Sequence, residues 1–147
     1  MEPFDLSVRN STYRLFREVG EAPSVGDVAG TLGAGADEVR SSWKRLHDGH
    51  ALVLMPDRDE LLMANPFSAV PTAYRVHADG RSWYGNCAWD AFGICAALHV
   101  DGAVETACAE CGDPILVELR DQVPDDASLL FHCLVPAARW WDDIAFT

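Results

Sequence analysis

The second half of the chain is organised around residues 74–90, which read YRVHADGRSWYGNCAWD. Polar and apolar side chains alternate over residues 74–77, as they do in a half-buried strand, and Asp79-Gly80 is typical of a tight hairpin turn. Residues 81–84 therefore predict the returning strand. Gly85 and Asn86 then end the strand pattern, and a helix is expected from residue 87 to about residue 99. A hairpin that leads directly into a helix predicts an α+β fold.

The start of this helix carries a thiol and a carboxyl three residues apart, at Cys87 and Asp90. Asn86 is a good N-cap, so Cys87 is expected in the first helical turn, where unpaired N–H groups and the helix dipole favour a thiolate. Residues three apart share one side of a helix. A thiolate binds soft metals or attacks electrophiles, and a nearby carboxyl carries protons. The alternative is a buried cysteine beside an ordinary helix-start aspartate.

The first 64 residues have a different pattern. Apolar residues at helical spacing predict three short helices, over residues 8–19, 25–32 and 37–47. Two apolar runs, 51–55 and 60–63, flank a turn and predict a hairpin. Three helices followed by a hairpin predict a winged-helix-like N-terminal region over residues 1–64.

The composition of residues 65–71 predicts a linker, so the second region is expected to span 65–147. After the Cys87 helix, strands are expected over residues 103–107, 115–119 and 129–135. One helix with short strands makes this region a small mixed helix/strand core, and the whole chain an α+β protein.

The net charge of −12, with only 11 basic residues, argues against a nucleic-acid-binding surface, although winged helices commonly bind DNA. No stretch approaches the roughly 18 apolar residues of a membrane span, and the N-terminus lacks the layout of a signal peptide. A cytoplasmic protein without membrane or nucleic-acid partners is expected. Its five cysteines are then interpreted as thiols or metal ligands rather than disulfides.

In this order, the features resemble those of the bacterial organomercurial (alkylmercury) lyases, over most of the chain. The hairpin of residues 74–84 resembles the family's approach to its catalytic helix, and Cys87-Ala88-Trp89-Asp90 is similar to its Cys-Ala-x-Asp motif. Residues 108–114, CAECGDP, resemble a Cys-x-x-x-Gly-x-Pro knuckle that is structural in the family. Residues 134–136 resemble a segment that precedes its last catalytic cysteine.

The resemblance implies an enzyme that cleaves carbon–mercury bonds by protonolysis, with a small organomercurial as substrate. Cys87 would bind mercury as a thiolate, because sulfur outcompetes oxygen and nitrogen for a soft metal. Asp90 would protonate the leaving carbon. Hg(II) would stay bound as product until cellular thiols remove it, and no cofactor would be required.

The chain departs from the family pattern at its end. The family's second catalytic cysteine corresponds to Thr147 or a residue just beyond it, so we expect a truncated core with impaired activity. Cys133 and Cys95 are candidate replacements as mercury ligands, with burial in the core as the alternative for each.

The pair Cys108 and Cys111 is half of a zinc-ribbon signature and is otherwise interpreted as structural thiols. Zinc would need two more ligands. His132 and Cys133 are adjacent, and on a strand they would point to opposite faces. The alternative function for the whole chain is a non-catalytic soft-metal-binding or sensing winged-helix protein.

Overall fold

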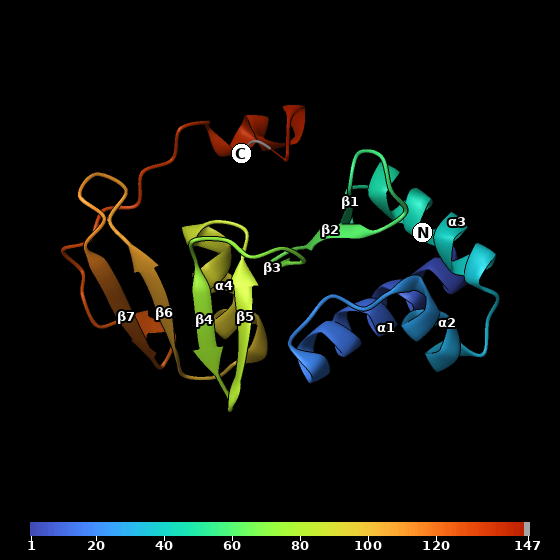
Figure 1. Cartoon of the computed structure of the whole chain (residues 1–147), viewed down its shortest axis with the longest axis horizontal. Helices are drawn as coiled ribbons and strands as arrows, with labels where there is room; N and C mark the ends of the chain where they lie inside the picture. The colour runs from blue at the N-terminus through green and yellow to red at the C-terminus, as the bar shows by residue number, and fades with distance from the viewer. Residues whose placement is uncertain (146–147) are drawn as a thin grey trace.

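The computed structural model describes residues 1–145 (Figure 1). Its helices are α1 (Pro3–Val19), α2 (Val25–Leu32), α3 (Ala36–Asp48) and α4 (Ala88–Leu98), with a final 3₁₀ turn over Ala137–Asp142. Its strands are β1 (Val53–Leu54), β2 (Leu61–Ala64), β3 (Phe67–Ser68), β4 (Arg75–Ala78), β5 (Arg81–Gly85), β6 (Gly102–Ala107), β7 (Pro114–Arg120) and β8 (Val123–Pro124). This mixture of helices and antiparallel strands confirms the α+β class.

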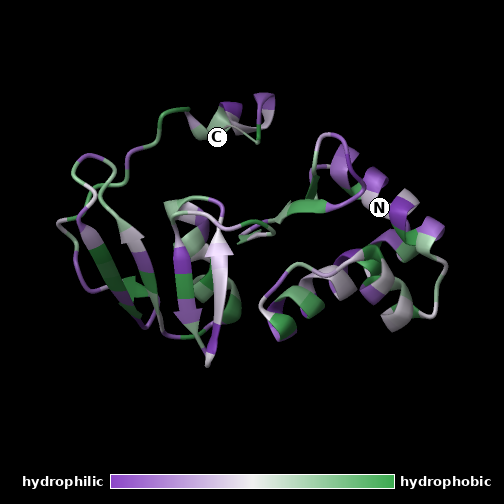
Figure 2. Ribbon diagram, in the orientation of Figure 1, coloured by the Kyte–Doolittle hydropathy of each residue, from purple (hydrophilic) through white to green (hydrophobic). Residues whose placement is uncertain are grey.

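The strands described within residues 1–145 form one sheet in the order β1-β2-β3-β5-β4-β6-β7-β8. All the pairings are antiparallel, and β4 lies between β5 and β6. Figure 2 shows hydrophilic and hydrophobic residues alternating along β4. Val76 and Ala78 are the buried members of that strand, as the period of two requires. The hairpin predicted from residues 74–84 is therefore confirmed.

The N-terminal helices form where local signals are strong. The helix α2 has the predicted bounds, because Ser24 and Asp27 form a reciprocal capping box and Gly33 adopts a left-handed conformation at the C-cap. The helix α1 begins at Pro3 rather than residue 8. Proline is favoured in the first helical turn, and the apolar period does not reveal a first turn whose buried residue is the polar Asp5. A β1–β2 hairpin follows α3 as expected, and the winged-helix comparison stays a prediction.

The segment predicted as a linker contains β3, which pairs with β2 on one side and β5 on the other. Phe67 of β3 is buried, and its ring stacks on Phe16 of α1 with ring centroids 5.3 Å apart. The ring centroid of Trp83 in β5 lies 6.0 Å from that of Phe67. Trp83 also donates a 2.9 Å hydrogen bond from Nε1 to the carbonyl of Phe16. The two halves thus share both a sheet and a core, while a domain boundary near residue 65 stays a prediction.

The strand predicted over residues 129–135 is wrong. These residues are irregular and mostly exposed, and they belong to a C-terminal segment that crosses from the β7 end of the sheet toward the β1 end (Figure 1). The apolar run there has no partner strand among the described residues, and strand propensity without pairing does not make a strand. No helix in residues 1–145 is long and apolar enough to cross a membrane.

Candidate mercury site

The end of β5 and the start of α4 position Cys87. Gly85 lets the two backbones approach closely, since a Cβ at this position would lie 2.6 Å from the amide nitrogen of Ala91. That same amide donates a 2.9 Å hydrogen bond to the carbonyl of Cys87, which closes the first turn of α4. Cys87 is therefore the N-cap, in an extended conformation, and the helix begins at Ala88. The expectation that Asn86 caps the helix is wrong by one residue.

The Cys87 side chain is half-buried. Burial raises the pKa of the Cys87 thiol, and the negative charges of Asp90 and Cys133 act in the same direction. The backbone N–H groups of Asp90 and Trp89 lower the pKa but do not compensate for burial. The expectation that the helix start makes Cys87 a ready thiolate is therefore wrong for the free chain.

Asp90 lies in the first turn of α4, and the Asn86 side chain holds its carboxylate. The Asn86 Nδ2 donates a 2.9 Å hydrogen bond to Asp90 Oδ2. It also lies 3.3 Å from Asn65 Oδ1, so the amide links the carboxylate to the turn before β3. Burial raises the pKa of Asp90, and the Asn86 hydrogen bond offsets part of that rise. The carboxylate is thus a better proton acceptor than an exposed aspartate.

Tyr13 of α1 is the nearest contribution of the N-terminal helices. Its hydroxyl lies 3.1 Å from the carbonyl of Asn65 and 3.2 Å from that of Ala51. Burial raises the pKa of Tyr13, and the charge of Asp90 adds to that rise, which puts the phenol within electrostatic range of the carboxylate. The Tyr13 hydroxyl thus links α1 to the Asn65 turn, which Asn86 also contacts.

A cavity of about 240 Å³ opens beside Cys87. Two thiols and three aromatic side chains characterise its lining, which consists of Tyr74, Asn86, Cys87, Phe131, His132, Cys133, Leu134, Val135 and Trp140. This volume is smaller than that of a drug-sized site and suits a small ligand. The outer wall comes from the irregular C-terminal segment. There, Trp140 packs edge-on against Trp89 of α4 with ring centroids 6.5 Å apart.

The structure thus brings Cys133 to the same cavity as Cys87. The thiol of Cys133 donates a 2.9 Å hydrogen bond to the carbonyl of Val135, which closes a local turn. His132 lines the cavity as well. The expectation that these neighbours point to opposite faces fails because the segment is not a strand. Cys95, in contrast, is fully buried in the core, where a Cβ on Gly102 would lie 2.8 Å from its sulfur.

Cys108 and Cys111 lie outside this cavity, in the turn between β6 and β7. No group of three or more His, Cys, Asp or Glu side chains in residues 1–145 could hold a metal together, so the structure gives no four-ligand zinc site at this turn. The position expected for the family's second catalytic cysteine, at or after Thr147, is outside the described residues.

Sequence reasoning missed two members of the site. Asn86 is predicted only as a helix cap, although an amide four residues before a carboxyl is a known helical pair that could have indicated its contact with Asp90. The sequence assigns Trp140 no role in the site. No local signal places it on the cavity, because its position depends on the path of the irregular segment.

Comparisons with known proteins identify the family and the fold. The model of the MerB family, described as alkylmercury lyase, matches residues 67–147, which is more than half of the chain. The crystal structure of the mercury-bound form of MerB2 is similar in fold, with a TM-score of 0.66 and 23% sequence identity over 86% of this chain. The chain spans 60% of the length of that MerB2 chain. A comparison with curated proteins found no match. The α+β fold and the family resemblance are thereby confirmed: the chain belongs to the alkylmercury lyase family.

Proposed function

We propose that this protein cleaves the carbon–mercury bond of small organomercurials by protonolysis, with Cys87 as the first mercury ligand and Asp90 as the proton carrier. The observation that carries the proposal is the cavity that Cys87 and Cys133 both line. Asp90 lies in the first turn of α4, where its backbone N–H and its charge both act on the Cys87 thiol. Membership of the alkylmercury lyase family supports the same reaction class.

The first step is ligand exchange at mercury. An R–Hg⁺ cation enters the cavity, a Cys87–S–Hg–R bond forms, and the thiol proton passes to the Asp90 carboxylate. Burial raises the pKa of both Cys87 and Asp90. The higher pKa favours the protonated thiol and makes the carboxylate a better acceptor for its proton. Mercury drives the exchange, because soft metals prefer sulfur.

In the second step, protonated Asp90 delivers this proton to the carbon bonded to mercury. The carbon–mercury bond breaks, R–H leaves, and Hg²⁺ stays on Cys87. Cys133 then releases its own proton to solvent and becomes the second sulfur ligand, so that Hg²⁺ is bound by two thiolates. Cellular thiols would remove the ion by further exchange and restore both cysteines.

Hydrocarbon release tests the proposal. The full chain is incubated with phenylmercury and a thiol, and benzene is measured in the headspace. Cys87→Ser and Asp90→Asn are expected to abolish release, because a hydroxyl is a poor mercury ligand and an amide carries no transferable proton. Asp37→Asn, which neutralises a carboxylate that is 98% exposed on α3, is the matched control and is expected to retain it.

Release that persists in Cys87→Ser would refute the proposal. Cys133→Ser separates the second ligand from the first. It is expected to slow release or trap mercury without abolishing the first ligand exchange. Tight Hg²⁺ binding by the unmodified chain with no hydrocarbon release would instead favour the soft-metal binder or sensor, or an enzyme impaired at its last ligand.

A further inference from the structure

The turn between β6 and β7 holds a second pair of thiols that the proposed reaction does not use. Cys108 directly follows β6, and its N–H donates a 2.8 Å hydrogen bond to the carbonyl of Asp113. The carbonyl of Cys108 accepts a 2.9 Å hydrogen bond from Gly112, whose φ of +76° is readily available to glycine. The pair Cys108 and Cys111 is therefore fixed on one closed turn rather than on a loose loop.

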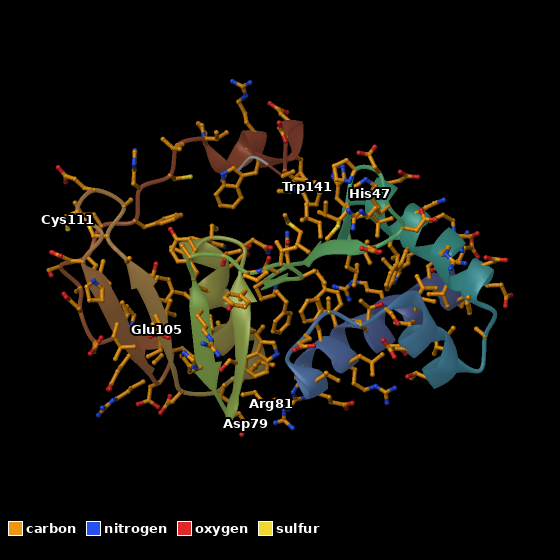
Figure 3. All side chains as sticks on the ribbon, viewed as in Figure 1. His47, Asp79, Arg81, Glu105, Cys111 and Trp141 are labelled. Atoms are coloured by element: carbon orange, nitrogen blue, oxygen red, sulfur yellow. The ribbon has the colours of Figure 1, made fainter. Side chains whose placement is uncertain are left out.

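Both thiols are accessible and interact with each other. Cys108 is half-buried and Cys111 is exposed at the tip of the β6–β7 hairpin (Figure 3). The backbone N–H groups of Cys111 and Glu110, followed by the side chain of Cys111, lower the pKa of Cys108. The backbone N–H of Asp113 lowers the pKa of Cys111, but the side chains of Asp113 and then Cys108 raise it, and the net shift is upward. The turn thus offers one thiol that ionises more readily than usual, with a second sulfur beside it.

The surroundings indicate which metals this pair suits. No third His, Cys, Asp or Glu joins the two thiols as a potential ligand within the described chain, which disfavours zinc and its usual four ligands. Two thiolates alone suit a soft cation that accepts two sulfur ligands, such as Hg²⁺. The neighbouring carboxylates of Glu110 and Asp113, in a chain of net charge −12, favour a cation over an anion at this surface.

We propose that Cys108 and Cys111 form a second mercury site, separate from the Cys87 cavity, that binds one Hg²⁺ between two sulfurs. Two S–H bonds break, two S–Hg bonds form, and two protons are released for each ion bound. This second site is not expected to cleave carbon–mercury bonds, because it lies on a turn and has no helix-borne carboxyl equivalent to Asp90. It would hold the inorganic ion at the surface, where thiols can reach it.

The test uses the full chain with Cys87→Ser and Cys133→Ser, so that the cavity thiols cannot contribute. One equivalent of Hg²⁺ is added with a monothiol competitor at about 0.1 mM, about tenfold below the roughly 1 mM effective concentration of a second thiol on a short linker. Native mass spectrometry counts retained mercury, and a weakly buffered titration counts protons. One Hg²⁺ and about two protons per chain are expected.

The matched variants are Cys111→Ser and Cys108→Ser in the same background. Each leaves one thiol in the turn, so mercury retention is expected to fall about tenfold, while circular dichroism confirms that the fold is kept. The intact pair should also keep mercury when Zn²⁺ is added in equal amount.

Equal retention in the single variants would overturn the proposal, because it would show that the sulfurs act independently. No retention by the intact pair would overturn it as well, as would displacement of the mercury by Zn²⁺. Since Cys87 is absent from every protein in this test, failure here leaves the proposed carbon–mercury cleavage untouched.

Discussion

The close approach of β5 and α4 at Gly85 makes a sharp prediction for Gly85→Ala. The new Cβ would lie 2.6 Å from the Ala91 amide nitrogen and 2.7 Å from its Cα, whereas ordinary contact begins at 3.4 Å. The two backbones must therefore separate by the difference between 3.4 and 2.6 Å, about 0.8 Å. Overpacking of this kind costs about 1–3 kcal/mol, and the upper end is expected because the contacted atoms are backbone.

The same displacement should also slow the proposed carbon–mercury cleavage. The Ala91 amide that the new Cβ contacts closes the turn bearing Cys87, so the thiol and Asp90 move with it. A misplacement near 1 Å is associated with about a 100-fold loss in rate. We therefore expect Gly85→Ala to lose about 2–3 kcal/mol of unfolding free energy and about 100-fold in hydrocarbon release.

Urea unfolding followed by circular dichroism, with benzene release measured on the folded variant, checks both effects. The matched control is Gly30→Ala in α2, where a Cβ meets nothing within 4 Å. That variant should be more stable by about 0.5–1 kcal/mol, because alanine is the better helix former, with unchanged release. A Gly85→Ala protein as stable and as active as the unmodified chain would refute the reasoning.

Two further predictions concern buried polar contacts. Asp5→Ala is expected to cost about 1–3 kcal/mol in denaturant unfolding, because it leaves the buried Ser42 hydroxyl without its 2.7 Å acceptor. The hydrogen bond from Arg45 lowers the pKa of Asp5 from 3.8 in the folded protein. The resulting stabilisation is therefore present above pH 3.8 and is lost as the pH falls through the pKa of Asp5 in the folded protein. Equal acid sensitivity of Asp5→Ala and the unmodified chain would contradict this expectation. Asn86→Ala removes the hydrogen-bond donor that favours ionised Asp90, so the pKa of Asp90 should rise further. The acidic limb of the pH profile of hydrocarbon release should then move to higher pH. An unchanged acidic limb would exclude a role for the Asn86 amide.

The elements that the sequence predicts well are those with strong local signals. The capping box at Ser24 sets the bounds of α2, and Asp79-Gly80 marks the turn between β4 and β5. The linker and the strand over residues 129–135 fail for a common reason. Pairing decides a strand, and pairing is a long-range property: Phe67 gains partners on both sides, whereas the apolar C-terminal run gains none in the part of the chain described.

The site was predictable to the extent that its residues share one helix start. Cys87 and Asp90 follow from their spacing and from the family motif. The raised pKa of Cys87 does not, because burial depends on the segment that covers it and outweighs the backbone N–H groups. Cys133 reaches the cavity through an irregular path, which no periodicity encodes.

The stack formed by Phe16, Phe67 and Trp83 has a consequence for how the protein unfolds. These rings join α1 to β3 and β5, and β3 is hydrogen-bonded into both halves of the sheet. Melting the N-terminal helices would expose this apolar surface and leave the carbonyl of Phe16 separated from Trp83. The halves should then lose structure together in one cooperative transition, so that weakening the N-terminal helices also opens the Cys87 cavity.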